Sequence, residues 1–441
     1  MSECLLSVGL DVGTTSTQMV FSRLTIENKA GSFAVPEMKI ENREILYKSP
    51  VHFTPLLRGD LVDAEALREI VDREYEMGGI RKAEVDTGAI IITGETSRKE
   101  NARTVLETLA GYAGDFVVAT AGPDLESILA AKGAGAVEYS VKTGKTVLHM
   151  DIGGGTSNLA LIADGEIVAT ACLNVGGRLL KISPDGRLNY VSPVLKRIFP
   201  KKEGEVATRE EVLVLCEKLV SALEAAAGFR EEDDLTRALR TAGAAEFPPP
   251  HRAVISFSGG VADCIETQKP WLSYGDIGPE LGTAIRKSRL CRGEYVLGQE
   301  TIRATVIGAG SHSAQLSGST VFHQNMTFPL KNLPVVRSAA ALRTLDSTGV
   351  LALQGMNTPG YGALQSLAEE ILRGFSGDML VLALEQDMAK ALGQCLALRL
   401  GKDARILCID RVKLEAESYL DVGAPIGPAL PVVVKTLILS K

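Results

Sequence analysis

The same short pattern occurs twice in the chain: an aspartate that ends an apolar strand, followed by glycines and small hydroxyl residues. Its first copy runs from Asp11 to Ser16 (DVGTTS) and its second from Asp151 to Ser157 (DIGGGTS). Each copy opens a β-β-β-α-β-α pattern, and the two patterns begin about 140 residues apart. A duplicated unit of this kind predicts two α/β domains that face each other.

The length of the chain also predicts more than one domain, because 441 residues are too many for a single hydrophobic core. We expect a first domain over residues 1–140 and a second over 141–330. The region 331–441 contains apolar strands and a helix from about Glu385 to Leu398, but no chemical motif. It is expected either to complete a domain or to form a surface that meets a partner.

Local signals support the alternation of strands and helices. Asp63 is placed to cap a helix, and Thr208 to Glu211 form a capping box that opens another. Apolar periodicity predicts a helix over Lys99 to Ala110 and strands over Arg43 to Phe53 and Ala253 to Phe257.

The two turns have the composition of phosphate-binding hairpins. Glycine lets backbone N–H groups approach phosphate oxygens, and the hydroxyls of Thr14, Thr15 and Thr156 can donate further hydrogen bonds. The carboxylates of Asp11 and Asp151 would hold Mg²⁺ through water, which magnesium retains beside nucleotide phosphates. An ordinary Gly-rich turn is the alternative for either copy alone, but two copies at the start of duplicated units disfavour it. The phosphate-binding residues expected are Gly13, Thr14, Thr15, Gly153, Gly154, Gly155 and Thr156.

Charge and hydropathy limit the partners. The net charge of -7 and a pI near 5.5 disfavour nucleic acid or an anionic membrane, because both require a basic face. No apolar stretch approaches the roughly 20 residues that span a bilayer, and the N-terminus, Met1 to Leu6, shows no basic segment before an apolar run and no cleavage site. A cytoplasmic protein is expected. The seven cysteines include no Cys-x-x-Cys pair, so a zinc or iron–sulfur site has little support.

The paired motifs resemble those of the superfamily that contains actin, the seventy-kilodalton heat-shock chaperones and the sugar kinases. The resemblance implies an actin-like ATPase fold, with two duplicated ribonuclease-H-like α/β domains around a nucleotide cleft, and ATP and Mg²⁺ as cofactors. It implies an adenosine motif at Val254 to Asp263, with Gly259 and Gly260 at its turn. Val306 to Ser311 is a weaker match, and a plain strand-to-helix turn is the alternative for both. Gly176 and Gly177 match a further position near the nucleotide.

The helix expected at Pro123 to Gly135 resembles the interdomain helix of this superfamily. Glu126 stands seven residues before Gly133, a spacing similar to that of the bacterial actin homologues. Glu126 would then act as a general base or orient the attacking water. A solvated helical glutamate is an equal alternative, and Glu95 is a second candidate for the role.

Two segments carry a closer resemblance, Ile92 to Ala102 (ITGETSRKENA) and Ile307 to Ser313 (IGAGSHS). Together with both hairpins and the tail Pro431 to Leu437, they make the whole chain resemble the family of ethanolamine ammonia-lyase reactivating proteins. The resemblance implies an ATP-dependent, chaperone-like ATPase that releases damaged cobalamin from the adenosylcobalamin-dependent lyase so that intact cofactor can enter. Because the ethanolamine pathway often operates in a bacterial microcompartment, association with its shell or lumen is an expectation.

Two other functions of the same fold remain open at this point: a small-molecule kinase, for which no sugar-kinase signature is found, and a filament-forming ATPase. His312 as a cobalt ligand is disfavoured, since the cobalamin-binding pattern Asp-x-His-x-x-Gly is absent and a loop histidine is the simpler interpretation.

Overall fold

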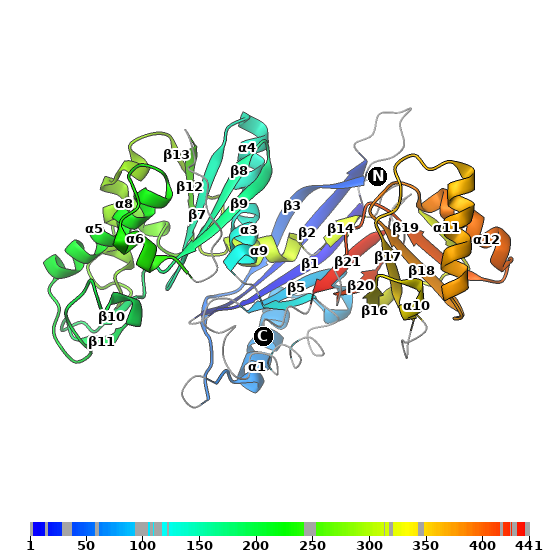
Figure 1. The fold of residues 1–441 in the computed structure, drawn as a ribbon. Helices are drawn as coiled ribbons and strands as arrows, with labels where there is room; N and C mark the ends of the chain where they lie inside the picture. Colours follow the sequence, from blue (N-terminus) through cyan, green and yellow to red (C-terminus); the bar gives the residue numbers. More distant parts are fainter. Residues whose placement is uncertain are drawn as a thin grey trace.

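The structure, a computed structural model, describes residues 3–13, 16–28, 38–57, 61–92, 105, 109, 117–120, 123–241, 253–312, 314–316, 321–342, 348–414, 418–423, 425 and 430–436. Its strands form sheets of six, five and eight strands and a small two-stranded sheet. Figure 1 shows these parts in a row, with the six-stranded sheet in the middle.

The six-stranded sheet has the strand order β3-β2-β1-β5-β6, with β4 paired to β2. β1, β2 and β3 are antiparallel neighbours, and β5 and β6 continue the sheet in parallel with β1. Pro50 follows β3, so the strand expected over 43–53 is divided into β3 and β4. The strands are β1 (Glu3–Val12), β2 (Ser16–Asn28), β3 (Met38–Lys48), β4 (His52–Phe53), β5 (Thr87–Ile92) and β6 (Val117–Thr120).

The five-stranded sheet repeats this topology, with the order β9-β8-β7-β12-β13. β7, β8 and β9 are antiparallel neighbours, and β12 and β13 continue in parallel with β7. The duplicated α/β unit expected from the sequence is therefore confirmed. The strands are β7 (Val147–Ile152), β8 (Ser157–Ala163), β9 (Glu166–Leu173), β12 (Val254–Ser258) and β13 (Tyr295–Leu297), and the small sheet consists of β10 (Leu180–Ile182) and β11 (Leu188–Val191).

Helices cover the outer faces of both sheets. α1 packs Leu67, Val71 and Tyr75 against the first sheet, and the side chain of Asp63 caps it as expected. The capping box of Thr208 and Glu211 opens α5, which packs on the second sheet. The helices of these two units are α1 (Ala64–Gly78), α3 (Pro123–Gly133), α4 (Ala136–Thr143), α5 (Arg209–Ala226), α6 (Asp234–Leu239), α7 (Asp263–Glu266), α8 (Gly278–Lys287) and α9 (Ala304–His312).

α3 and α9 cross between the inner faces of the two sheets (Figure 1). α9 packs on β1, β2 and β5, whereas α3 packs on β7, β8 and β9. At the crossing a Cβ on Gly133 would lie 1.7 Å from the carbonyl oxygen of Ala304, and one on Gly308 would lie 2.0 Å from that of Leu129. The two backbones therefore touch, which only glycine permits. The interpretation of Val306 to Ser311 as a strand ending in a glycine turn is wrong, because this segment is helix α9 and its glycine serves the crossing.

The eight-stranded sheet has the order β14-β21-β20-β16-β17-β18-β19-β15. The neighbouring strands β16, β17, β18 and β19 are parallel, with α11 and α12 packed on one face. β18 occupies residues 379–384, so the helix expected from Glu385 begins at Ala389 and ends at Leu400. The elements are β14 (Ala314–Leu316), β15 (Phe322–Gln324), β16 (Leu330–Val336), α10 (Ala339–Leu342), β17 (Val350–Leu353), α11 (Tyr361–Gly374), β18 (Met379–Leu384), α12 (Ala389–Leu400), β19 (Arg405–Ile409), β20 (Ser418–Val422) and β21 (Pro431–Thr436).

This third sheet has its own buried clusters on both faces. Its strands begin at Ala314, before the expected boundary at residue 330, while α9 packs on the first sheet rather than on the second. The division of the chain into domains remains a proposal, and we place its last boundary between α9 and β14.

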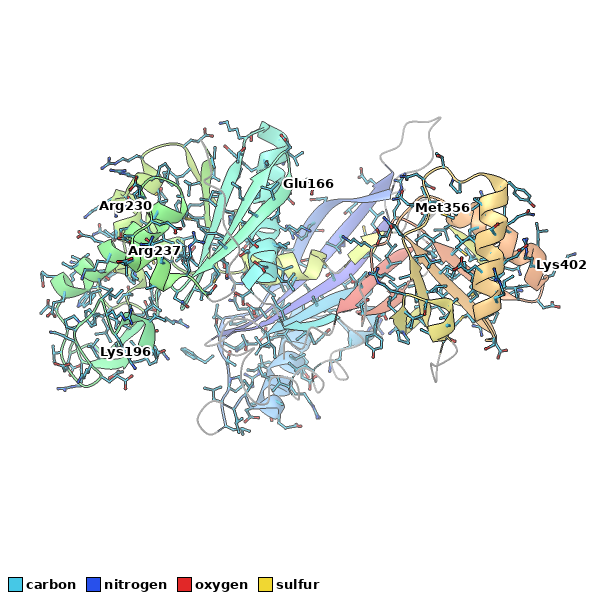
Figure 2. The ribbon with its side chains drawn as sticks, in the orientation of Figure 1. Glu166, Lys196, Arg230, Arg237, Met356 and Lys402 are labelled. Atoms are coloured by element: carbon cyan, nitrogen blue, oxygen red, sulfur yellow. The ribbon has the colours of Figure 1, made fainter. Side chains whose placement is uncertain are left out.

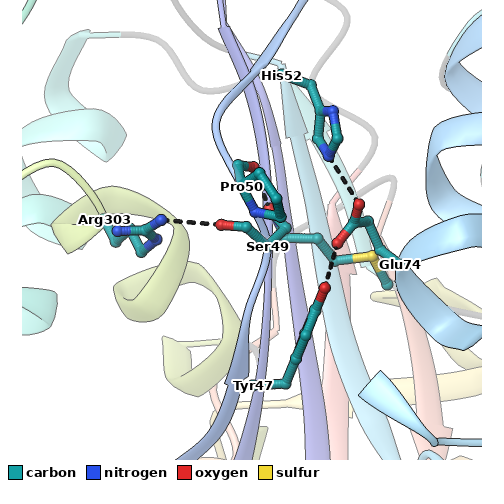
Figure 3. A network of polar contacts seen from close by, with 7 residues as sticks. Tyr47, Ser49, Pro50, His52, Glu74 and Arg303 are labelled. Atoms are coloured by element: carbon teal, nitrogen blue, oxygen red, sulfur yellow. Dashed lines mark hydrogen bonds and ion pairs between the residues drawn. The ribbon is translucent and has the colours of Figure 1, made fainter. Parts of the chain in front are cut away.

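A polar network fixes the edge of the first sheet near the start of α9. Glu74 of α1 is buried and accepts hydrogen bonds from Tyr47 (2.6 Å) and from the ring of His52 (2.7 Å). Arg303, one residue before α9, donates to the backbone oxygen of Ser49 at 2.8 Å (Figure 3). The N-terminus of α9 is thus hydrogen-bonded to the turn between β3 and β4.

Charged side chains lie on the periphery. Figure 2 shows Lys196, Arg230 and Arg237 on the outer surface of the second unit and Lys402 at the far end of the third. Within the described parts of the chain, no helix is long and apolar enough to cross a membrane.

Candidate functional site

Both hairpin aspartates lie near the ends of equivalent strands. Asp11 is the next-to-last residue of β1 and Asp151 that of β7. The turn after each strand is closed by the same hydrogen bond, from Gly13 N to Ser16 O and from Gly153 N to Thr156 O, at 2.9 Å in both. The two motifs therefore fold into equivalent hairpins.

The aspartates share the sheet faces that carry α3 and α9. Side chains alternate along a strand, so Asp11 lies on the same face as Ser7, which donates to Gly310 O of α9 at 2.6 Å. Asp151 lies on the same face as Val147, which belongs to the buried cluster beneath α3 and α4. Each hairpin thus places its carboxylate on the inner face of its sheet.

Asp151 is buried and belongs to a chain of polar contacts between β7 and β12. Burial raises the pKa of its carboxyl to about 6, and a hydrogen bond from Ser258 opposes this rise. His149 Nε2 lies 2.9 Å from Ser258 Oγ, and its Nδ1 lies 3.0 Å from Ser256 Oγ. Complete burial lowers the pKa of His149 to about 3, so the ring is neutral.

The direction of these hydrogen bonds follows from the charge of Asp151. An ionised carboxylate only accepts, so the Ser258 hydroxyl donates to it and must accept from His149 Nε2–H. Nδ1 then accepts from Ser256. The strand expected to end in the adenosine motif therefore holds the orientation of a candidate magnesium-binding carboxylate.

Glu126 lies at the second hairpin, in the first turn of α3. Only 7% of its surface is exposed, and it accepts a hydrogen bond from Asn158 Nδ2 at 2.8 Å. Asn158 is directly opposite Asp151 in the β7–β8 register. Asp124 in the same turn of α3 accepts from Thr170 of β9 at 2.6 Å, which anchors the helix to this sheet. The structure thus brings Glu126 and Asp151 together through Asn158.

The glycines of the second hairpin have different surroundings. A Cβ on Gly155 would meet no atom within 4 Å, and one on Gly153 only Thr156 O at 3.6 Å. By contrast, a Cβ on Gly176 would lie 2.4 Å from Gly154 O, because Gly177 N and Arg178 N donate to the backbone of the hairpin. Close packing therefore explains Gly176, whereas Gly155 presents its backbone to open space.

The candidate adenosine loop meets the first unit through residues 301 and 302. Gly259 has a φ of 84°, and its N–H donates to Thr301 O at 3.0 Å. A Cβ on Gly260 would lie 3.8 Å from Ile302 Cδ1, and Ile302 O accepts from Gln18 Nε2 at 3.3 Å. Gly177 packs against Gly278. Contact of Gly176, Gly177, Gly259 and Gly260 with a nucleotide remains a prediction.

Several sequence predictions cannot be compared with the structure. Thr14, Thr15 and Glu95 lie outside the described residues. His312 ends α9, but its side chain is outside the description. Thr156, half-buried beside the turn, is where the hairpin motif places it.

Sequence reasoning missed four residues that shape this site: Gln18, Asn158, Ser258 and Arg178. The side-chain carbons of Arg178 lie 3.4–3.6 Å from the Cβ position of Gly154, and its guanidinium pairs with the buried Asp276 at 3.4 Å. A cation therefore lies beside the second hairpin. A signal for the two amides was present, because each stands seven residues after its hairpin aspartate.

The residues present fit a hydrated magnesium ion bound to a nucleotide. The hairpin carboxylates of Asp11 and Asp151 have the oxygen atoms that hard cations prefer, and the hairpin backbone at Gly155 is open to phosphate. Among the described residues no cluster of three or more His, Cys, Asp or Glu side chains surrounds a metal position.

Two sheets of one topology, equivalent aspartate hairpins and two crossing helices define an actin-like fold. Comparison with known proteins identifies the family. The family model described as "Ethanolamine utilisation protein EutA" matches residues 3–349 and 341–440, so the chain belongs to this family.

Two relatives are similar over nearly their whole lengths. The chain is 39% identical to the ethanolamine ammonia-lyase reactivase EutA of Salmonella typhimurium and 38% identical to that of Escherichia coli, with 98% of each chain covered in both comparisons. Among solved structures, it is similar to a PPX-GPPA enzyme of Aquifex aeolicus, with 13% identity and a TM-score of 0.42 over 69% of this chain and 99% of the other.

The open position at Gly155 gives a direct test of nucleotide binding. Gly155→Ala should leave the fold and melting temperature unchanged, because its methyl group meets no protein atom, but should weaken ATP binding about tenfold or more by occupying the phosphate approach. Isothermal titration with Mg-ATP measures this. Gly293→Ala is the matched control, since its Cβ also meets nothing within 4 Å. Equal affinities of the two variants would contradict phosphate binding at this hairpin.

Proposed function

We propose that the protein is an ATP-dependent, chaperone-like reactivating factor for adenosylcobalamin-dependent ethanolamine ammonia-lyase. It would promote release of damaged cobalamin from the lyase and its exchange for intact cofactor. The observation that carries the proposal is the similarity, over 98% of both chains, to two proteins named as reactivases of this lyase. The paired aspartate hairpins support the dependence on ATP.

In this proposal the two hairpins bind the phosphates of ATP. The backbone N–H groups of Gly154 and Gly155 would face phosphate oxygens, with Thr14, Thr15 and Thr156 donating from their hydroxyls. Gly13 and Gly153 use their N–H groups to close the turns, and their lack of a side chain would leave room for the phosphates. Asp11 and Asp151 would hold Mg²⁺ through water, and the ion would neutralise charge on the phosphates. Glu126, fixed by Asn158, would orient the water that attacks the terminal phosphate.

Coupling to the lyase would occur through the two crossing helices. α3 is anchored to the second sheet and α9 to the first, so a change in the angle between the units changes the angle between the helices. A nucleotide that contacts both hairpins favours one angle over the other. It can change affinity for a partner by no more than its own preference between the two conformations.

The third unit, residues 314–436, is a candidate for the surface that meets the lyase, because it forms its own sheet at one end of the molecule (Figure 1). Association with a bacterial microcompartment is part of the same proposal, since the ethanolamine pathway often operates in one.

A reactivation assay tests the proposal. Lyase inactivated with a cobalamin that lacks its adenosyl group should recover activity when this protein, Mg-ATP and fresh adenosylcobalamin are added together. Omitting ATP, or replacing it with a non-hydrolysable analogue, shows whether hydrolysis is needed.

Two further measurements separate the alternatives of the same fold. A kinase would phosphorylate ethanolamine, and a filament protein would sediment with ATP alone; neither result is expected. If this protein binds Mg-ATP but does not restore lyase activity, the fold assignment stands and the proposed function is rejected.

A further inference from the structure

An accessible arginine side chain lies beside the second hairpin. Gly177 N donates to Gly153 O at 2.9 Å, and Arg178 N donates to Gly154 O at 2.6 Å. These two hydrogen bonds fix the backbone of Arg178 alongside the hairpin. Its side-chain carbons lie 3.4–3.6 Å from the position of a Cβ on Gly154, so the side chain runs along the glycine turn. The exposed fraction of this side chain is 34%.

A buried carboxylate fixes the other end of the arginine. Asp276 Oδ2 lies 3.4 Å from Arg178 Nε, and only 8% of the Asp276 side chain is exposed. Asp276 is held in turn by Gly278 N, at the start of α8, which donates to its Oδ1 at 2.9 Å. Arg178 is therefore held at its backbone by the hairpin and at its guanidinium by Asp276.

The guanidinium can bind a second anion while it is paired with Asp276. It has five N–H donors in a rigid planar fork, and the ion pair with Asp276 is made at Nε. The geometry of the fork matches carboxylate and phosphate groups, and its charge is retained at every physiological pH. An arginine that is oriented by one carboxylate and still accessible has the properties of a phosphate-binding side chain.

The surroundings of Arg178 favour a phosphate group as this second anion. A Cβ on Gly155, the residue after Gly154, would meet no atom within 4 Å, so the hairpin backbone beside the arginine is open. Asp151 and Glu126 are buried at the same hairpin. Ionised carboxylates repel a phosphate chain, and the repulsion is stronger where water is partly excluded. A cation in contact with the hairpin opposes this repulsion.

We propose that Arg178 binds the phosphate chain of the nucleotide, donating hydrogen bonds from its guanidinium to a phosphate oxygen while Asp276 holds its orientation. The arginine supplies a fixed positive charge from the protein in addition to that of the magnesium ion. This inference rests on the proposed binding of ATP at the hairpins, and it adds a residue that recognises the phosphates of that ligand.

Removal of the guanidinium tests this role, but Arg178→Met alone leaves the Asp276 carboxylate buried without its cation and can destabilise the fold. The comparison is therefore made between Asp276→Asn and the double variant that carries Asp276→Asn and Arg178→Met. Asparagine keeps the oxygen that accepts from Gly278 N, and methionine keeps an apolar stem that packs along Gly154. Isothermal titration with Mg-ATP and with adenosine measures the two affinities, and thermal melting verifies the fold.

The double variant should bind Mg-ATP about 10- to 100-fold more weakly than Asp276→Asn, because a charge-assisted hydrogen bond to phosphate is lost. The affinity for adenosine should be the same in both variants, since adenosine has no phosphate. Arg187→Met is the matched control, because Arg187 also lies beside an aspartate, Asp185 at 3.6 Å, but at the exposed turn between β10 and β11. This control should bind Mg-ATP like the parent.

Three results would overturn the proposal. Equal Mg-ATP affinities of the double variant and Asp276→Asn would show that Arg178 does not contact the phosphates. An equal loss of affinity for Mg-ATP and for adenosine would show that Arg178 serves only the fold. If the parent itself does not bind Mg-ATP, this inference and the dependence on ATP in the proposed function are both rejected; parent binding with an unaffected double variant rejects this inference alone.

Discussion

Replacement of Asp11 or Asp151 by alanine is expected to reduce Mg-dependent ATP hydrolysis about 10³-fold or more. Each carboxylate contributes to holding the ion that stabilises charge on the phosphates, an effect worth several kcal/mol in the transition state. The two positions are equivalent, near the ends of β1 and β7 on the inner faces of their sheets. Because each aspartate belongs to a different sheet, neither should compensate for loss of the other.

Phosphate release under saturating Mg-ATP measures this effect, with circular dichroism to verify the fold. Asp185→Ala is the matched control, because Asp185 also precedes a glycine in a hairpin turn, between β10 and β11, but lies exposed on the second unit. Undiminished turnover in both hairpin variants would remove the assignment of the magnesium site. A loss in Asp185→Ala equal to theirs would show that the assay reports stability instead.

The second large effect is expected from Glu126→Gln, which should lower turnover about 10²- to 10⁴-fold with little change in ATP affinity. Glutamine keeps the shape of the side chain and an oxygen that still accepts from Asn158 Nδ2, so α3 should remain in place. What is removed is the negative charge that would orient and deprotonate the attacking water.

Single-turnover hydrolysis and a separate binding titration distinguish the two parameters. Asp124→Asn changes an acid in the same turn of the same helix, bound to Thr170, and should hydrolyse ATP normally. Normal hydrolysis by Glu126→Gln together with loss in Glu95→Gln would assign the water-positioning role to Glu95.

The parts of the fold that the sequence predicted are those with local signals. The Asp-Gly turns, the capping residue Asp63 and the capping box at Thr208 each depend on neighbours within a few residues, and each is present in the structure. The repeated order of strands followed from the repeated motif. The apolar run from Ala253 to Phe257 was enough to find β12 because this strand is buried along its whole length.

The parts that were missed depend on contacts between distant segments. The third sheet pairs strands from 314 to 436 in an order unlike that of the sequence, which no local pattern specifies. The glycines of α9 were interpreted as a strand-ending turn because a helix that touches another backbone and a turn that touches a ligand require the same residue. The link from His149 through Ser258 to Asp151 joins strands more than 100 residues apart, so it became visible only with the register of β7 and β12.

The contact of α3 and α9 at Gly133 and Gly308 has a mechanical consequence. At these two glycines the nearest atoms of the other helix are backbone atoms, so a change of angle requires less repacking there than at a crossing of interlocked side chains. α3 is bound to the second sheet through Asp124, and α9 to the first through Gly310. The crossing would then be the pivot about which the two sheets rotate, and atoms farther from the pivot would move farther. If nucleotide binding changes this angle as proposed, a small shift around the phosphates would become a larger movement at the outer ends of the molecule.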